Sequence, residues 1–301
     1  MMTEYRLGID WGSTHRRAYL LDAQGNVLDR CADACGVMSA SGNFADMLST
    51  LLQRWPGLPA DVEVIMAGMI GSRSGWLEVP YLPTPVSLHA VGSQMTTLRH
   101  DQARVYIVPG VCDDAGPDIM RGEETQVLGA WHLGGGDGCY LLPGTHSKWV
   151  WVENGAIVRL MTFMTGELYA QFQQAGSLSG LLQAGQDDPQ AFLAGVDAST
   201  SGRPLSRSLF GLRAAVLRGQ LPTHAARAWL SGLLIGTEWA DPEVQQLAQR
   251  GTVRIVGDPI LWPLHQQVAS RYGVDTCCFD PDAVFVAALS ALSQPRKEAT
   301  P

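Results

Sequence analysis

Charged residues are scarce in this sequence, and long hydrophobic runs are missing. Only 17% of the 301 residues are charged, against about 25% in typical domains, and the net charge is −8. Nucleic acid is therefore not expected as a partner, because binding phosphate backbones needs a basic face. No apolar run approaches the ~20 residues of a membrane span, and the opening residues lack the layout of a signal peptide. These absences predict a cytoplasmic chain without membrane partners.

Several well-known site patterns are also absent. The six cysteines form no C-x-x-C pair and no secreted disulfide framework, which predicts ordinary thiols in a reducing compartment. There is no G-x-x-x-x-G-K-[ST] phosphate loop and no G-x-S-x-G nucleophile turn. These gaps exclude P-loop enzymes and α/β-hydrolases of the usual kind.

The first clear pattern is a strand that leads into a glycine turn. Residues 5–9 alternate between apolar and other side chains up to Asp10, and Gly12-Ser13-Thr14 then leads into a second strand-like segment, Arg17-Ala18-Tyr19-Leu20-Leu21. Such alternation is typical of strands, and glycine beside hydroxyl residues is typical of a tight turn. We expect a third strand at 27–30 after a second turn.

The same succession returns in the second half. Strand-like residues 140–142 lead to Pro143-Gly144-Thr145-His146-Ser147, and two more strand-like runs follow, 148–152 and 156–160. The rest of the chain shows mainly helical spacing, including residues 281–292 near its end. The duplication predicts an α/β protein with two mixed-sheet domains.

We expect the first domain to span residues 1–112 and the second residues 113–301, because residues 112–117 are polar and turn-rich. Whether the last predicted helix, residues 281–292, packs back on the first domain stays open at this point.

Both glycine turns suit phosphate. A tight turn between strands directs several backbone N–H groups toward one point, glycine allows close approach, and hydroxyls add donors. One such turn is common, but two of them, each opening one half of the chain, predict a cleft that holds one nucleotide from both sides. Asp10, at the end of the first strand, is a candidate ligand of Mg²⁺, directly or through water.

These motifs resemble the actin/hexokinase-like ATP-binding superfamily, which has a ribonuclease H-like fold. Ile9 to Thr14 is similar to its first phosphate motif, and Pro143 to Ser147 to its second. Sugar kinases of this superfamily carry a Gly-acid motif before the second one, and its carboxylate receives the proton of the attacking hydroxyl. The resemblance implies that Glu123 has this role, where Asp is usual, and that Gly257 lies near adenosine.

A narrower resemblance covers nearly the whole chain, to the 2-dehydro-3-deoxygalactonokinase family. It implies ATP- and Mg²⁺-dependent phosphorylation of the terminal C6 hydroxyl of 2-dehydro-3-deoxy-D-galactonate, in galactonate catabolism. Six segments carry it in order: Asp10-Trp11-Gly12-Ser13-Thr14, Ala67-Gly68-Met69-Ile70-Gly71-Ser72, Met120-Arg121-Gly122-Glu123-Glu124-Thr125-Gln126, Pro143-Gly144-Thr145-His146, Met164-Thr165-Gly166-Glu167-Leu168 and Ser231-Gly232-Leu233-Leu234-Ile235-Gly236.

The motifs and the resemblance together give the candidate site residues. Catalysis is expected from Glu123 and Asp10, with Asp10 also as metal ligand and Glu124 as the second choice for the base. The remaining candidates bind nucleotide (Gly12, Ser13, Thr14, Arg17, Gly144, Thr145, His146, Ser147, Lys148 and Gly257) or substrate (Gly71, Ser72, Trp76, Arg121 and Glu124).

Ordinary interpretations stay open for several of these residues. Acids in the first turn of a helix often only complement its dipole, which applies to Glu123 and Glu124. The role of His146 could be limited to stabilising its turn, and Trp76 could be a core residue. Two other functions also remain: a kinase of another sugar or polyol, and an ATP-driven switch protein. The expected partners are ATP and a sugar acid, and a homodimer is one option.

Overall fold

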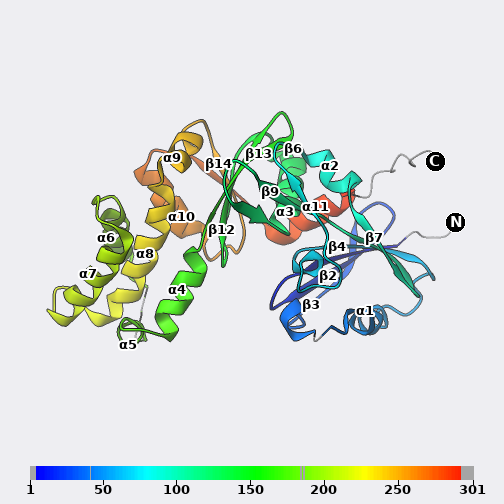
Figure 1. Cartoon of the computed structure of the whole chain (residues 1–301), viewed down its shortest axis with the longest axis horizontal. Coiled ribbons are helices and arrows are strands. Elements are labelled where there is room, and N and C mark those ends of the chain that lie inside the picture. Colours follow the sequence, from blue (N-terminus) through cyan, green and yellow to red (C-terminus); the bar gives the residue numbers. More distant parts are fainter. Residues whose placement is uncertain (1–4, 41, 184, 186, 293–301) are drawn as a thin grey trace. The chain divides into compact units, whose positions relative to one another are not determined.

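The computed structural model describes residues 5–40, 42–183, 185 and 187–292, which fall into two compact units (Figure 1). The first unit contains the described chain up to Asp137, together with Val150–Leu160 and the chain from Phe279 on. The second contains Gly138–Trp149 and Met161–Cys278. The division at 112/113 stays a prediction about the duplicated halves.

The main sheet of the first unit has the strand order β3-β2-β1-β4-β8-β7. The first strand pairs antiparallel with the second, with Asp10 opposite Arg17, and parallel with the fourth. The strands expected from the alternation at the start of the chain are present. The six strands of this sheet are β1 (Arg6–Trp11), β2 (Arg16–Leu21), β3 (Val27–Asp33), β4 (Val62–Ala67), β7 (Thr96–His100) and β8 (Ala103–Ile107).

A three-stranded sheet, β10-β9-β5, and several helices complete this unit. The turn-rich stretch 112–117 covers the end of β9 and the turn to β10, and these two strands pair antiparallel. The bounds are β5 (Tyr81–Pro83), β6 (Val86–Ser87), β9 (Gly110–Asp113), β10 (Asp118–Met120), α1 (Phe44–Leu52), α2 (Leu88–Ser93), α3 (Glu123–Ala130) and α11 (Pro281–Leu292).

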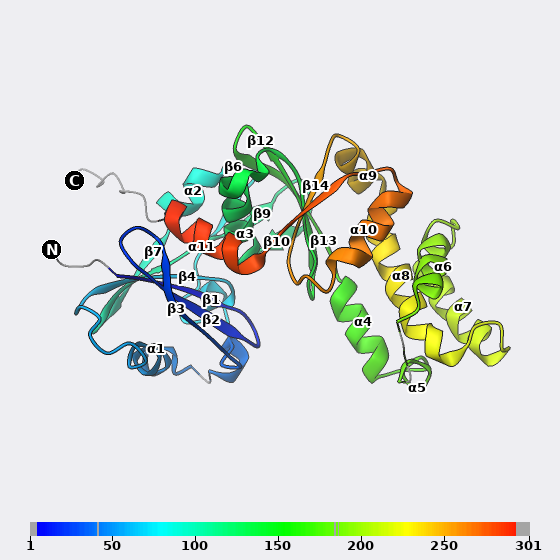
Figure 2. The ribbon, with the colours of Figure 1, turned by 180° about the vertical axis from the view of Figure 1, so that it is seen from behind.

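Alternation along β1 places α1 and α11 on opposite faces of the main sheet. Leu7 and Ile9 face one way and join a buried cluster with α1, whereas Gly8 faces the other way, against Leu289 of α11. Figure 2 shows β1, β2 and β3 side by side, with α1 on one side of them and α11 on the other. Asp10 shares the α11 side with Gly8, since side chains two residues apart point the same way.

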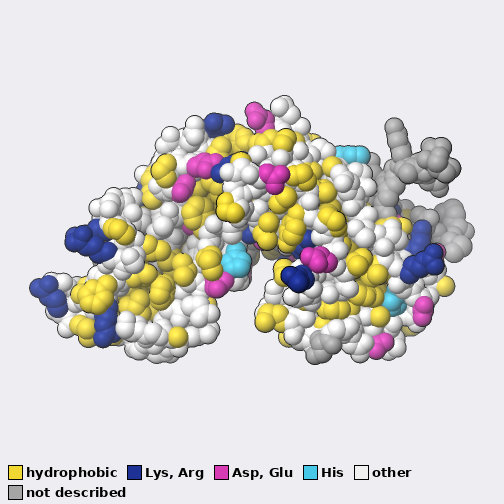
Figure 3. Space-filling model, in the orientation of Figure 1, with side chains coloured by type: hydrophobic (Ala, Val, Ile, Leu, Met, Phe, Trp, Pro, Cys, Tyr) yellow, Lys and Arg dark blue, Asp and Glu magenta, His cyan; other side chains and the backbone are white. Residues whose placement is uncertain are grey.

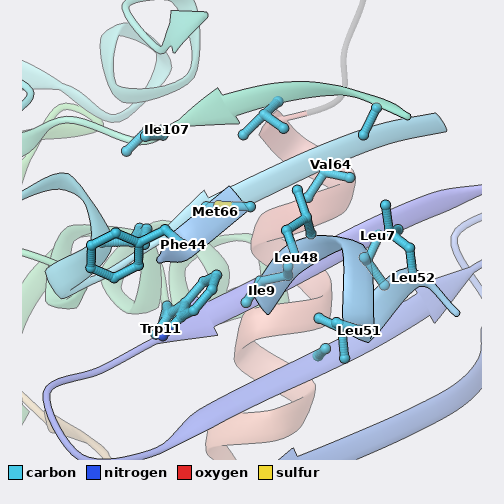
Figure 4. Packing of buried hydrophobic residues seen from close by; sticks show 14 of the residues in the cluster. Leu7, Ile9, Trp11, Phe44, Leu48, Leu51, Leu52, Val64, Met66 and Ile107 are labelled. Atoms are coloured by element: carbon cyan, nitrogen blue, oxygen red, sulfur yellow. The ribbon is translucent and has the colours of Figure 1, made fainter. Parts of the chain in front are cut away.

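The core of the first unit lies between α1 and the sheet. Its members come from β1, β4, β8 and α1, and Trp11 packs edge-on against Phe44 with ring centroids 5.8 Å apart. Figure 4 shows how Leu48 of α1 points toward the side chains of β1 and β4. This packing fixes the end of β1, where the first glycine turn begins.

The second unit combines strands with a group of helices. Strands follow the order β15-β14-β11-β12-β13, with β11 parallel to β14; β12 and β13 have residues in both units, and β13 pairs with β6 in the first. The bounds are β11 (Gly138–Leu142), β12 (Ser147–Glu153), β13 (Ala156–Phe163), β14 (Val253–Val256), β15 (Thr276–Phe279), α4 (Thr165–Gln174), α5 (Ser179–Leu182), α6 (Pro189–Ser199), α7 (Leu205–Leu217), α8 (Ala226–Trp239), α9 (Pro242–Ala248) and α10 (Trp262–Arg271).

Three observations bear on the expectations from composition. All six cysteines are free thiols. Within the described residues, no helix is long and apolar enough to cross a membrane. On the face that Figure 3 shows, Lys and Arg side chains are scattered and form no single basic patch.

Helices α3 and α11 pack closely because a glycine lies between them. A Cβ added at Gly129 would collide with the backbone oxygen of Val284. We therefore predict that Gly129→Ala lowers the free energy of unfolding by about 1–3 kcal/mol, the usual cost of overpacking. Urea denaturation of the purified variant measures the change.

Gly211→Ala in α7 is the matched control. A Cβ at Gly211 would meet no atom within 4 Å, and alanine is favoured over glycine in a helix by up to about 1 kcal/mol. This variant should be at least as stable as the wild type. Equal stability of the two variants would contradict the proposed helix contact.

Candidate active site

The first glycine turn is held from behind and leaves two of its amides available, while the Gly12 N–H donates to the His15 carbonyl oxygen at 2.9 Å. The carbonyl oxygens of Gly12, Ser13 and Thr14 accept hydrogen bonds from the backbone of residues 36–38. Within the described part of the chain, the backbone N–H groups of Ser13 and Thr14 have no hydrogen-bond partner. Rigid, unpaired amides in a turn form the kind of concavity that binds anions.

Asp10 is ion-paired with Arg17, which stands opposite it on β2. Both Nη2 and Nε of Arg17 donate to Oδ2 of Asp10, the latter at 3.2 Å. Burial alone would lower the pKa of Arg17, but the nearby Asp10 carboxylate raises it above its ordinary value. Arg17 also reaches Asp282 of α11, with 3.4 Å between Nη1 and Oδ1.

Asp282 is in turn shared among three groups of the same sheet face. Its Oδ1 accepts from the Tyr19 hydroxyl at 2.6 Å, and its Oδ2 from Arg30 at 2.8 Å. The expected nucleotide-binding residue Arg17 therefore belongs to a charge network that includes the last helix.

Two glycines join the loop after β4 to the start of α3. Gly68 and Gly122 both have positive φ, 92° and 106°, a region that glycine adopts at little cost. A Cβ at Gly122 would lie 3.1 Å from the Gly68 Cα, and one at Gly68 would lie 2.9 Å from the Trp11 carbonyl oxygen. The ends of β1 and β4 and the first turn of α3 therefore meet at one place.

The two acids that begin α3 have different environments. Glu124 is completely buried and accepts hydrogen bonds from the Gly122 N–H and the Thr125 hydroxyl. Burial, together with the charge of Glu123, raises the pKa of Glu124 to about 8. Glu123 is only half-buried, and its Oε2 accepts from the Arg121 N–H at 3.0 Å. Glu123 is thus the more accessible of the two carboxylates.

Arg121 lies under the loop that contains Gly71 and Ser72. Its Nη2 donates to the Val79 carbonyl oxygen at 2.6 Å, and its guanidinium carbon lies 4.2 Å from the centre of the Tyr81 ring. The side chain is buried, and its Nε and Nη1 have no hydrogen-bond partner among the residues that the structure describes. Arg121 therefore places an uncompensated positive charge beneath this loop.

Two other expected substrate residues make contacts inside the first unit. The Ser72 hydroxyl donates to the Met69 carbonyl oxygen at 2.7 Å. Trp76 stacks on Phe44 and meets His100 edge-on, with ring centroids 6.4 and 6.0 Å apart. Trp76 is partly exposed beside the core, so its role as a wall of a sugar pocket stays a prediction.

The second glycine turn is joined to the start of α4. The Thr145 carbonyl oxygen accepts from the Glu167 N–H at 2.9 Å, and a Cβ at Gly166 would collide with the Gly144 carbonyl oxygen. The His146 ring and the Glu167 carboxylate meet at 2.6 Å between Nε2 and Oε2. The segments Pro143–His146 and Met164–Leu168, two of the six that carry the family resemblance, therefore contact each other.

The last two candidate residues of the turn point to opposite faces of β12. Ser147 is buried. Lys148 is also buried, and its Nζ donates to the Thr162 hydroxyl at 2.9 Å. Gly257 lies against Pro143, where a Cβ would be 3.2 Å from the Pro143 carbonyl oxygen.

The structure therefore gathers the candidates into two sets. The first unit holds Asp10, the first turn, Arg17, the Gly71–Ser72 loop, Trp76, Arg121 and the two acids. The second unit holds the turn 143–147, Lys148 and Gly257. The buried Glu238, which accepts from the Trp149 indole N–H at 3.0 Å, was missed at the sequence level, and the available signal was one acid within the apolar helical run 226–239.

Comparisons of the sequence and of the structure with known proteins point to the same family. The family model described as 2-keto-3-deoxy-galactonokinase matches residues 10–292. A relative from Escherichia coli K12, 2-dehydro-3-deoxygalactonokinase, is 32% identical over 295 residues, which is 97% of this chain and 98% of the relative. A crystal structure from Sinorhizobium meliloti, assigned to the same kinase, has a TM-score of 0.86 and 32% identity, covering 96% of this chain and 98% of that one.

A more distant structure supports the fold alone. The activator of a 2-hydroxyisocaproyl-CoA dehydratase from Clostridium difficile has a TM-score of 0.51 at 13% identity, covering 96% of this chain and 95% of that one. The expected actin/hexokinase-like α/β fold is confirmed. With matches in sequence and structure over nearly its whole length, the chain belongs to the 2-keto-3-deoxy-galactonokinase family.

Proposed function

We propose that this chain transfers the γ-phosphoryl group of ATP to the C6 hydroxyl of 2-dehydro-3-deoxy-D-galactonate. The observation that carries the proposal is the approach of Gly122 to Gly68, which brings Glu123 to the edge where β1 and β4 end. Phosphoryl transfer to a hydroxyl needs alignment, neutralisation of charge and a proton acceptor. The residues at this edge supply all three.

Phosphate binding is assigned to the backbone of the two glycine turns. In the first turn, the unpaired amides of Ser13 and Thr14 are donors for phosphate oxygens. In the second turn, Gly144, Thr145 and His146 have the corresponding role, and Gly257 beside Pro143 is assigned to the nucleoside. The Ser147 side chain is buried, so its proposed contribution is through the backbone.

Mg²⁺ fits the first turn on the chemistry of its donors. Within the described residues, no group of three or more His, Cys, Asp and Glu side chains could hold an ion, and Mg²⁺ usually takes one or two carboxylates plus substrate phosphates. Asp10 offers such a carboxylate, and Oδ1 lies 3.4 Å from the position that a Cβ on Gly68 would take. The ion would supply charge neutralisation at the phosphates.

Glu123 is the proposed general base. As the C6 oxygen bonds to the γ-phosphorus, its proton passes to the Glu123 carboxylate and ADP leaves. Arg121, with its uncompensated charge, favours binding of the carboxylate of the sugar acid. The N–H groups of Gly71 and Ser72 and the Ser72 hydroxyl bond inside their own loop, so the proposed role of these two residues is to shape the pocket. Glu124 holds the first turn of α3, which positions Glu123.

The acceptor is tested by an ATP-consumption assay with a panel of sugar acids, neutral sugars and polyols. We expect turnover with 2-keto-3-deoxy acids and little with neutral acceptors, because the buried charge of Arg121 needs an anion nearby. Preference for a neutral sugar or polyol would assign a different kinase activity. Hydrolysis of ATP that no acceptor stimulates would favour a switch protein.

The base is tested by comparing Glu123→Gln with Glu124→Gln. Losing a general base lowers kcat by ~10²-fold or more, so we expect this loss for E123Q, with the affinity for ADP unchanged. E124Q should retain more activity, because the buried Glu124 carboxyl acts through hydrogen bonds that glutamine can partly replace. A larger loss in E124Q would make Glu124 the base.

The role of Asp10 is tested by Asp10→Asn, with Asp282→Asn as the matched control. Both residues accept from Arg17, but only Asp10 lies at the first turn. We expect D10N to lower kcat/KM for ATP by ~10-fold or more, as for loss of one charge-assisted contact. D282N should reduce thermal stability and change this kinetic constant much less. Similar kinetics in both variants would remove Asp10 from nucleotide binding.

A further inference from the structure

Glu167, in the first turn of α4, contacts the second glycine turn but has no role in the chemistry described above. Its N–H donates to the Thr145 carbonyl oxygen at 2.9 Å, and its Oε2 lies 2.6 Å from Nε2 of His146. An acid in the first turn of a helix often only complements the helix dipole. That role needs no partner outside the helix, so the contact with His146 indicates a further function for this carboxylate.

The contact fixes one nitrogen of the His146 ring and leaves the other without a partner. An ionised carboxylate only accepts hydrogen bonds, so Nε2 of His146 carries a proton and donates to Oε2 of Glu167. Among the residues that the structure describes, Nδ1 of His146 has no hydrogen-bond partner. The side chain is 45% exposed, so a ligand can reach the ring.

The backbone next to His146 is held by the same segment. Gly166 precedes Glu167, and a Cβ at Gly166 would collide with the Gly144 carbonyl oxygen and lie 2.9 Å from the Thr145 Cα. Together with the bond from the Glu167 N–H to Thr145, this contact fixes one side of the turn. The start of α4 therefore positions both the backbone of the turn and the ring beside it.

His146 also supplies the positive charge that phosphate binding favours. It is the one residue of the second glycine turn whose side chain can be a cation, since the others are Pro, Gly, Thr and Ser. The neighbouring Lys148 is buried, and its Nζ donates to the Thr162 hydroxyl. The first glycine turn has a comparable cation, because Arg17 pairs with Asp10 beside it. Charge-assisted hydrogen bonds are the strong ones for phosphate, and the His146 ring is the candidate donor here.

We propose that His146 binds a phosphate of the nucleotide through Nδ1, and that Glu167 is a positioning residue that holds the ring for this contact. The inference rests on the proposed phosphate-binding role of the second glycine turn. With nucleotide bound, the ring lies between a carboxylate and a phosphate, and a protonated imidazole donates to both. Glu167 acts through the ring, because contact of its own carboxylate with a phosphate would bring two anions together.

The first experiment measures ADP binding in the presence of Mg²⁺ by calorimetry, and the KM values for ATP and for the acceptor, in the full chain. We expect His146→Ala to weaken ADP binding and raise KM for ATP by ~10-fold, the scale of one charge-assisted hydrogen bond, with KM for the acceptor unchanged. Wild-type ADP binding in a folded H146A would overturn the proposal. So would a change confined to KM for the acceptor, which would assign the ring to the sugar acid.

Two substitutions of Glu167 separate its hydrogen bond from its charge. Glu167→Ala and Glu167→Gln both remove the negative charge and keep the backbone N–H that bonds Thr145, but only Gln keeps a side-chain acceptor for Nε2 of His146. We therefore expect E167A to bind ADP ~3-fold or more weakly than E167Q. Equal ADP binding in the two variants would contradict the positioning role, and this comparison stays decisive if H146A does not fold.

A double-mutant cycle tests whether Glu167 acts through His146. In the H146A background, the difference in ADP binding between E167A and E167Q should disappear, because both chains lack the ring. A difference that persists there would mean that Glu167 acts on the nucleotide by another path, and the proposal would be wrong.

Asp197→Ala is the matched control. Asp197 of α6 forms a comparable exposed ion pair in the same unit, with 2.7 Å between its Oδ1 and Nη1 of Arg271 in α10. D197A should bind ADP as the wild type does. A loss as large as that in H146A would show that exposed ion pairs affect binding in general, against a specific role for His146. A wild-type chain that binds no ADP would overturn the kinase assignment as well, which separates the two failures.

Discussion

The candidate site in the first unit depends on a close backbone contact between Gly68 and Gly122, which leaves no room for a side chain at either residue. A Cβ at Gly122 would press on the Cα of Gly68, and a Cβ at Gly68 would press on the Trp11 carbonyl oxygen. This contact joins three separate segments: the end of β1 with Asp10, the loop after β4, and the first turn of α3 with Glu123. Without it, the proposed metal-binding carboxylate and the proposed base would have no common frame.

Each unit carries a completely buried glutamate next to a glycine turn or loop. Glu124 accepts from the Gly122 N–H in the first unit, and Glu238 accepts from Trp149 in the second. Both have a raised pKa because of burial. A turn whose amides must stay unpaired for a ligand cannot be stabilised by its own hydrogen bonds, so its rigidity has to come from groups behind it. For the first turn these groups are the backbone N–H groups of residues 36–38, whereas Glu124 holds the start of α3 and Glu238 bonds Trp149 on the strand that follows the second turn.

The sequence was most informative where periodicity or a motif acts locally. The strands around both glycine turns and the helices α1, α8 and α11 follow apolar spacing and were predicted. Helix α6 was missed because it packs on α8 through glycine, with Gly195 against the Trp229 backbone, and close contact of this kind leaves little apolar periodicity. β7 was missed because it is a polar edge strand. The partners of Glu238 lie far away in sequence, 89 residues in the case of Trp149, so no local pattern reveals them.

The position of α11 affects how the protein is made. This helix closes the first unit, with Leu289 seated against Gly8 of the first strand and Val284 against α3. During synthesis the opening sheet therefore leaves the ribosome before the helix that covers this face, and the face stays uncovered until α11 has emerged. The middle of the chain has time to fold meanwhile, whereas the unit that contains the acid pair is completed last. A nascent or prematurely terminated chain would thus expose apolar surface to chaperones and proteases, and it would not release a partly active kinase that consumes ATP.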